Sequence, residues 1–125
     1  FSQPSTMEQS DVLITDWSGI AYEYAFKTKR PVLFVDTPMK VINPEWKKID
    51  LVPTDISFRN EVGVSVPMDD MAKAGQAVSD MLAAPDKFAA KIDALLKAQF
   101  FNPGRAGEVV GAYILDSLIA KRKKS

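Results

Sequence analysis

Short apolar runs and a helical pattern alternate in the first third of the chain. Residues 12–14 (Val-Leu-Ile) and 32–35 (Val-Leu-Phe-Val) are continuous apolar runs, typical of short strands covered on both faces. Between them, residues 18 to 28 repeat apolar side chains at helical spacing, namely Ile20, Ala21, Tyr24 and Ala25. Strand, helix and strand in this order predict a right-handed βαβ unit with a parallel sheet.

The pattern continues with a third strand and three helices. Val62, Val64 and Val66 alternate with Gly63 and Ser65, which predicts a short strand closed by proline. Three further stretches, starting near residues 69, 85 and 105, carry apolar stripes of helical period. The residues expected to be buried in them are Met71, Ala74, Val78, Met81 and Leu82, then Phe88, Ile92, Leu95 and Leu96, then Ala106, Val109, Val110, Tyr113, Ile114 and Leu118.

These elements predict an α/β fold in one domain over residues 1–125. The segment 36–61 is interrupted by three prolines, and a short helical turn is expected near residues 44–48. A segment of this length without regular structure is usually functional or mobile. We therefore expect one parallel sheet, with helices, and one long connection before its third strand.

The amino-acid composition excludes several kinds of chemistry for this chain. Lys plus Arg and Asp plus Glu number 16 each, so the net charge is zero, which argues against nucleic acid as a partner. The chain contains neither Cys nor His, and so lacks a thiolate nucleophile, the commonest general base and the commonest metal ligand. No apolar run approaches the roughly 18 residues that span a bilayer. We expect a cytoplasmic protein that needs no metal or other cofactor.

The turn after the first strand is the main candidate site. Asp16 or Ser18 can cap the following helix, and Gly19 leaves its first backbone N–H groups unshielded. A helix start of this kind attracts anions. The turns at residues 16–19 and 36–40 should lie at one edge of the sheet, where ligands bind in open α/β folds. Two interpretations stay open: an ordinary capped junction, or a diphosphate site formed by Asp16, Ser18 and Gly19.

Charged residues elsewhere supply further candidates. Glu23 lies four residues after Gly19 on the same helix side, so it could reach ribose hydroxyls or simply face solvent. Arg59 could bind a phosphate oxygen or be an exposed loop arginine. Weaker candidates are Lys40, Lys47 and Lys48.

The last helix has polar residues at both ends. Asn102 and Arg105 could contact an anion at its start, but a structural Asn-Pro-Gly turn is the preferred interpretation. A basic tail follows its end and either remains in solvent or contacts an anionic membrane surface. The tail residues are Lys121, Arg122, Lys123 and Lys124.

The segment Ser10-Asp-Val-Leu-Ile-Thr-Asp-Trp-Ser-Gly-Ile-Ala-Tyr-Glu-Tyr-Ala25, with Lys29-Arg-Pro-Val-Leu-Phe34, resembles a known family. It is similar to the C-terminal part of CDP-glycerol glycerophosphotransferases, the teichoic-acid-type polymerases and primases. Their pattern is a strand ending in Thr-Asp-Tyr-Ser-Ser, a helix, Gly-Lys-Pro and a second strand. Residues 58–63 and 102–107 are similar too, less distinctively.

The resemblance implies a Rossmann-like three-layer domain with a short parallel sheet and C-terminal helices, the C-terminal half of a GT-B enzyme. By the family pattern, Ser18 and Gly19 lie near the diphosphate of CDP-glycerol and Glu23 lies near the ribose. This chain departs from the pattern at Trp17, where the family has Tyr, and at Gly19, where it has Ser.

Three functions stay open. The first is a donor-binding domain that helps move glycerol phosphate to a surface-polymer hydroxyl, peripheral on the inner face of the membrane. The second is a domain of a nucleotide-sugar glycosyltransferase or UDP-sugar 2-epimerase, because Gly19 resembles the turn of those enzymes. The third is a non-catalytic α/β module that binds a partner protein.

The family's catalytic histidines have no counterpart in these 125 residues. The resemblance places them in a preceding Rossmann-like domain, and efficient transfer needs a base near the acceptor hydroxyl. We therefore predict no glycerophosphate transfer by this chain alone, measured as release of CMP from CDP-glycerol with a polymer acceptor. Measurable turnover would contradict the prediction.

Overall fold

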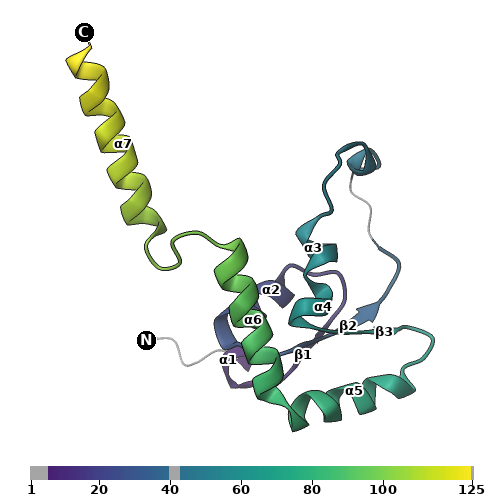
Figure 1. The fold of residues 1–125 in the computed structure, drawn as a ribbon. Helices are drawn as coiled ribbons and strands as arrows, with labels where there is room; N and C mark the ends of the chain where they lie inside the picture. The colour runs from purple at the N-terminus through teal and green to yellow at the C-terminus, as the bar shows by residue number, and fades with distance from the viewer. Residues whose placement is uncertain (1–5, 40–42, 125) are drawn as a thin grey trace. The chain divides into compact units, whose positions relative to one another are not determined.

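A three-stranded parallel sheet organises the computed structural model, which describes residues 6–39 and 43–124. The strands are β1 (Leu13–Thr15), β2 (Val32–Asp36) and β3 (Gly63–Pro67), in the order β1-β2-β3 (Figure 1). Leu13 lies opposite Val32, which in turn lies opposite Gly63. The predicted α/β class and parallel βαβ unit are confirmed, and the layout is compatible with a Rossmann-like fold.

Helices of very different length connect and follow the strands. They are α1 (Thr6–Gln9), α2 (Ile20–Thr28), the 3₁₀ turn η1 (Trp46–Lys48), α3 (Thr54–Ser57), α4 (Arg59–Val62), α5 (Ala72–Ala83), α6 (Pro85–Gln99) and α7 (Ala106–Lys123). The turn expected near residues 44–48 is confirmed as η1. The short helices α3 and α4, just before β3, were not predicted. They occupy the end of the long connection and bring Arg59 back to the sheet.

The chain divides into two units, residues 1–95 and residues 96–125. The first contains the sheet and the helices up to most of α6, and the second contains α7. The single domain expected over residues 1–125 stays a prediction.

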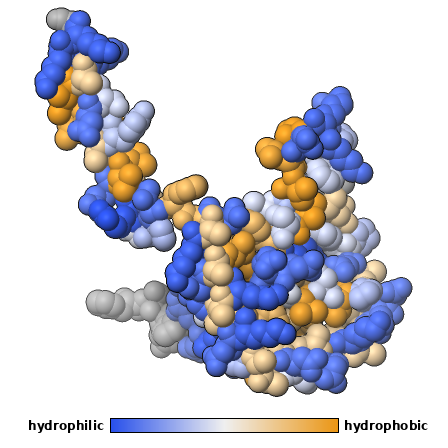
Figure 2. All heavy atoms as spheres, viewed as in Figure 1, coloured by the Kyte–Doolittle hydropathy of each residue, from blue (hydrophilic) through white to orange (hydrophobic). Residues whose placement is uncertain are grey.

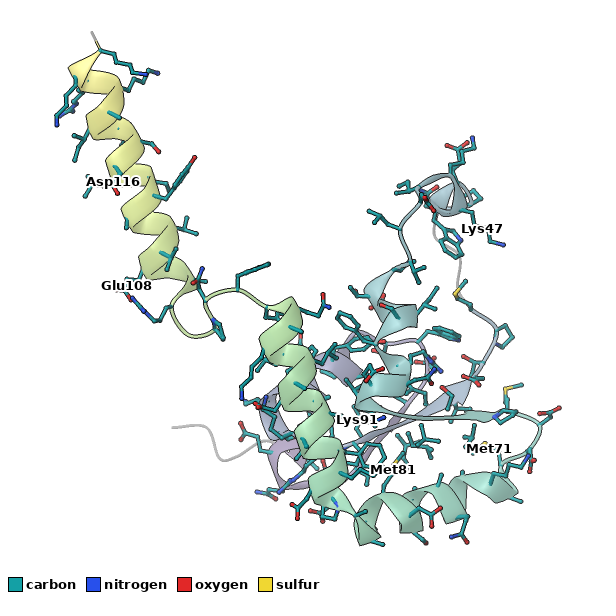
Figure 3. The ribbon with its side chains drawn as sticks, viewed as in Figure 1. Lys47, Met71, Met81, Lys91, Glu108 and Asp116 are labelled. Atoms are coloured by element: carbon teal, nitrogen blue, oxygen red, sulfur yellow. The ribbon has the colours of Figure 1, made fainter. Side chains whose placement is uncertain are left out.

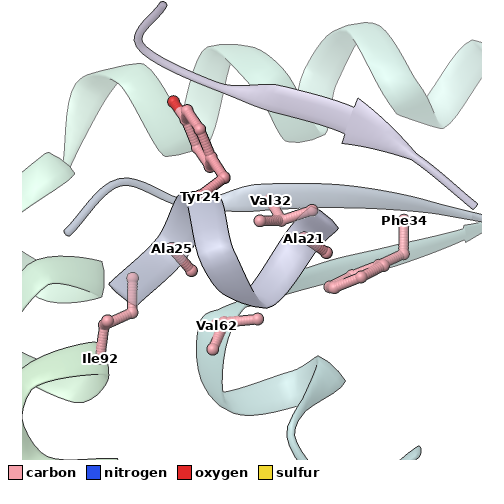
Figure 4. Packing of buried hydrophobic residues seen from close by; sticks show 7 residues of the cluster. All are labelled: Ala21, Tyr24, Ala25, Val32, Phe34, Val62 and Ile92. Carbon is pink, nitrogen blue, oxygen red and sulfur yellow. The ribbon is translucent and has the colours of Figure 1, made fainter. Parts of the chain in front are cut away.

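Strand β2 is buried on both faces. Val32 and Phe34 pack on one face against α2, where Tyr24 is also buried (Figure 4). Leu33 alternates to the opposite face and packs with Met81 of α5, a residue labelled in Figure 3. Helices therefore cover the central strand from both sides, as parallel sheets require.

Strand β1 departs from the predicted pattern. Ile14 is 57% exposed, so the prediction that this strand is covered on both faces is wrong. The register places Ile14 beside Leu33, on the face that α5 covers. Because α5 packs on β2 and β3, the edge strand β1 keeps this side chain in contact with solvent.

The stripe predicted on α5 is partly correct. Ala74, Val78 and Met81 pack into the core, whereas Met71 (48% exposed) and Leu82 (52% exposed) do not. Met71 precedes the first residue of α5, and Leu82 follows Met81 by one position, which points it about 100° away around the helix. On α6 the predicted stripe is confirmed for Ile92, which is fully buried, and for Phe88 and Leu95, which pack against the core, while Leu96 is half-buried.

The second unit consists mainly of α7 and the turn before it. Asn102 and Gly104 have positive φ values of 52° and 76°, and Arg105 N–H donates to the Asn102 carbonyl over 2.9 Å, which confirms the Asn-Pro-Gly turn. The predicted stripe of α7 is not buried within this unit, since Val109 is 39% and Tyr113 is 73% exposed. A lone helix cannot cover its own side chains. Among the described residues, no helix has the length and apolar character needed to cross a membrane.

Gly63 allows β3 to approach β2. A Cβ built on Gly63 would collide with the carbonyl oxygen of Val32, a backbone atom that cannot move without disturbing the buried strand.

We predict that Gly63→Ala lowers the free energy of unfolding by about 1–3 kcal/mol, measured by chemical denaturation. The matched control is Gly75→Ala in α5, where a Cβ meets nothing within 4 Å. It should raise stability by about 0.5–1 kcal/mol. Equal effects of the two variants would contradict the close approach.

Candidate functional site

The turns after β1 and β2 are tied together at the carboxyl edge of the sheet. The indole Nε1–H of Trp17 donates to the carbonyl oxygen of Thr37 over 2.7 Å. Arg59, from α4, reaches both turns, since it contacts the carbonyl oxygen of Asp16 and the carboxylate of Asp36. The prediction that the two turns share one edge is therefore confirmed for their described residues, 16–19 and 36–39.

Arg59 is the centre of this junction. Its side chain is only 6% exposed, and Nη2 lies 2.6 Å from Oδ1 of Asp36, whose side chain is 41% exposed. Two weaker bonds of 3.4 Å join Nη1 to the Asp16 carbonyl and Nε to Oγ of Ser65. The guanidinium carbon also lies 3.8 Å from the ring centre of Trp17 and 4.3 Å from that of Phe34. Arg59 is thus an interior residue of a helix; the alternative of an exposed loop arginine is wrong.

Helix α2 starts without a side-chain cap. Its N-cap residue is Gly19, with φ −61° and ψ −21°, and no side chain bonds to the first turn. The prediction that Asp16 or Ser18 caps the helix is therefore wrong. The N-cap position falls on Gly19, one residue after Ser18, and glycine has no side chain that could bond to the first turn. The carbonyls of Ser18 and Gly19 accept the N–H groups of Ala21 and Tyr22, which leaves the preceding amides for another acceptor.

The predicted donor-binding residues gather around this helix start. Asp16, Ser18 and Gly19 lie in the turn itself, and Glu23 is exposed one turn along α2. Within residues 6–39 and 43–124, the Ser18 hydroxyl and the carboxylates of Asp16 and Glu23 make no hydrogen bond or ion pair. These groups are therefore available to a ligand.

The charge of the junction is not positive. Asp16 contributes an exposed carboxylate, and the charge of Arg59 is paired with that of Asp36. The attraction for an anion must come from the backbone amides and the dipole of α2. The negative charge of a diphosphate bound there would have to be balanced by a cation or by basic residues from another part of the protein.

The remaining basic candidates are separate from this junction. Lys40 falls outside the described residues. Lys48 pairs with Glu45 over 2.6 Å, and Lys47 lies 5.7 Å from the ring centre of Trp46 (Figure 3). Arg105 forms a two-point bond with Glu108. The described tail residues Lys121, Arg122 and Lys123 end α7, and Lys124 follows it.

A pocket in the described part of the chain lies away from the turn. A cavity of about 250 Å³ lies between β3 and the α5–α6 corner, lined by Val64, Ala77, Asp80, Met81, Ala84, Lys87 and Phe88. It shares no residue with the junction. In the described ranges, no three His, Cys, Asp or Glu side chains are grouped so that they could hold a metal ion.

Three residues of the junction were not predicted from the sequence. Trp17, Asp36 and Tyr22 all contact it, and Asp36 could have been found because it ends a strand at the predicted ligand edge. Tyr22 packs between Phe34 and Phe58, at 6.3 Å between ring centres, and its hydroxyl donates to the Asp55 carbonyl over 2.7 Å. Burial and the nearby negative charge of Asp55 raise the pKa of Tyr22 to about 12, while Arg59 opposes the rise.

Comparison with known proteins does not assign a family. The chain matches no protein-family model, no curated protein and no solved structure. The similarity of residues 10–34 to glycerophosphotransferases therefore stays an expectation based on the motif.

The raised pKa of Tyr22 predicts a pH dependence of stability. A phenol in the unfolded chain ionises near pH 10, and Tyr22 in the folded chain ionises near pH 12. Between these values ionisation favours the unfolded state, so the free energy of unfolding should fall as pH rises from 10 to 12. Tyr22→Phe should show a shallower fall over this range, measured by denaturant unfolding at each pH. Parallel pH profiles would contradict the assignment.

Proposed function

We propose that the start of α2 binds the diphosphate of a nucleotide-activated donor. The single observation that supports this most is the position of the turn 16–19. It lies at the carboxyl edge of a parallel sheet, ahead of a helix whose first amides have no side-chain cap. That is the edge where open α/β folds bind ligands, and uncapped amides are suited to phosphate oxygens. Ser18 and Gly19 would donate to the diphosphate, and Glu23 would accept from the ribose.

The donor we favour is CDP-glycerol. Its support is the resemblance of residues 10–34 to glycerophosphotransferases, together with the parallel α/β fold. In such an enzyme an acceptor hydroxyl attacks the β-phosphorus, the glycerol phosphate forms a new ester with the polymer, and CMP leaves. This chain would supply donor binding as the C-terminal half of a GT-B enzyme, and the catalytic base would come from a second domain. Catalysis would depend on positioning and charge stabilisation.

Two alternatives follow from particular residues. Gly19 also suits the turn of a nucleotide-sugar enzyme, so UDP-sugars are the competing donors. Exposed apolar side chains between η1 and α3 favour the second alternative, a protein-interaction module (Figure 2). These side chains are Ile49, Leu51 and Val52, which are 59%, 76% and 66% exposed.

A charge placed in the turn tests the diphosphate site. We predict that Ser18→Asp weakens binding of CDP-glycerol by roughly tenfold or more, because a like charge faces the phosphates. Isothermal titration calorimetry at fixed ionic strength measures the affinity, with UDP-glucose titrated in parallel to separate the donor classes. Ser79→Asp is the matched control, since Ser79 is exposed on α5 and lies outside the turn. Unchanged affinity in Ser18→Asp would favour the interaction module.

Glu23 provides a second and independent test. Glu23→Gln should weaken the binding of CDP by several-fold but leave the binding of pyrophosphate unchanged, since pyrophosphate has no ribose. The comparison of the two ligands by calorimetry removes any general effect of the lost charge. An equal change for both ligands would exclude the ribose contact.

A further inference from the structure

We propose that Arg59 is a positioning residue, which holds the turn 16–19 against the sheet instead of binding phosphate itself. The sequence alone leaves open whether Arg59 binds a phosphate oxygen or is an exposed loop arginine. The effect of Arg59 on ligand affinity rests on the proposed function, but its effect on the order of the turn does not.

The guanidinium of Arg59 is surrounded by protein groups. Trp17 and Phe34 lie over it, with ring centres 3.8 and 4.3 Å from its central carbon. Each of its three nitrogens donates to a protein oxygen, of Ser65, Asp16 or Asp36. Three of the five N–H donors are thereby used, and because the side chain is only 6% exposed, little of the guanidinium can reach a ligand.

The contacts of Arg59 divide into two groups. Phe34, Asp36 and Ser65 belong to the paired strands β2 and β3. The ring of Trp17 and the carbonyl of Asp16 belong to the turn, immediately before Ser18 and Gly19. Arg59 is therefore a bridge from the sheet to the residues that would donate to the diphosphate. Arg59 is itself the first residue of α4, so a third element anchors the bridge.

Charge supports positioning over direct contact. A buried guanidinium that is 6% exposed needs a paired carboxylate, and Asp36 supplies it at 2.6 Å. The pair presents little net positive charge to a ligand. Lysine could replace the charge but neither the flat stacking surface nor the fork of donors.

The turn of the ligand-free protein provides the first test. In a Trp46→Phe background, Trp17 is the sole tryptophan, so near-ultraviolet circular dichroism reports on its packing. Backbone ¹⁵N relaxation reports on the amides of residues 17–20. We expect Arg59→Lys to lower their order parameters from about 0.85 to below about 0.6 and to weaken the Trp17 signal.

Met81→Ala is the matched control. Met81 is buried on the opposite face of the sheet, so its loss should reduce global stability and leave the turn ordered. Asp36→Asn is the second variant, because Asp36 is partly exposed and its replacement retains the shape of the side chain. It should loosen the turn less than Arg59→Lys. An ordered turn in both Arg59→Lys and Asp36→Asn would overturn the proposal.

Pyrophosphate binding separates positioning from direct contact. Positioning predicts that both variants weaken pyrophosphate affinity, Arg59→Lys by roughly tenfold, because a loosened turn must be ordered on binding. Direct contact predicts that Asp36→Asn strengthens binding, since it would free the guanidinium, and that result would overturn the proposal. If the unaltered chain binds no pyrophosphate, the proposed function fails, while the ligand-free measurements still decide the role of Arg59.

Discussion

The burial of β2 on both faces is the constraint on which the rest of the structure depends. Val32 and Phe34 require α2 on one side, and Leu33 requires α5 on the other. A strand that is covered on both faces also needs a neighbouring strand at each edge, because its backbone N–H and C=O groups are buried and must be paired. The order β1-β2-β3 meets this condition with few residues. As a result, the ends of three strands and the start of α2 come together at one edge.

Arg59 joins these strand ends and the turn before α2 into one junction. An interior cation needs compensation, and here two aromatic rings and a carboxylate provide it. The same contacts fix Trp17 and hence the backbone that follows it. The turn proposed to bind a ligand is therefore held from the protein interior through Trp17, whereas the side chains of Asp16 and Ser18 have no protein partner among the described residues. That division suits a site that binds through backbone amides.

Apolar periodicity was sufficient to predict the strands, the long helices and most of the buried face of α2, because these depend on local pattern. Ala21, Tyr24 and Ala25 are buried there as predicted, whereas Ile20 is 37% exposed. The exposure of Ile14 could not be predicted, since it depends on which strand lies at the edge and how far α5 extends. The missing cap depends on the backbone of Gly19, which the residue type leaves open. The position of Arg59 depends on Trp17 and Phe34, which lie far away in the sequence. The turn itself was predicted because strand ends and helix starts are local features.

The contact between Gly63 and Val32 also determines how β3 aligns with β2. If β3 moved by one residue, Val62 or Val64 would replace Gly63, and its side chain would meet the carbonyl of Val32. The same shift would turn Val66 from the covered face of the sheet to the other face, since side chains alternate along a strand. Sterics and hydrophobic burial thus exclude the same misaligned pairings. The missing side chain at Gly63 and the burial of Val66 thus favour the same strand register, and the junction around Arg59 depends on it because Ser65 contacts Arg59 only in that register.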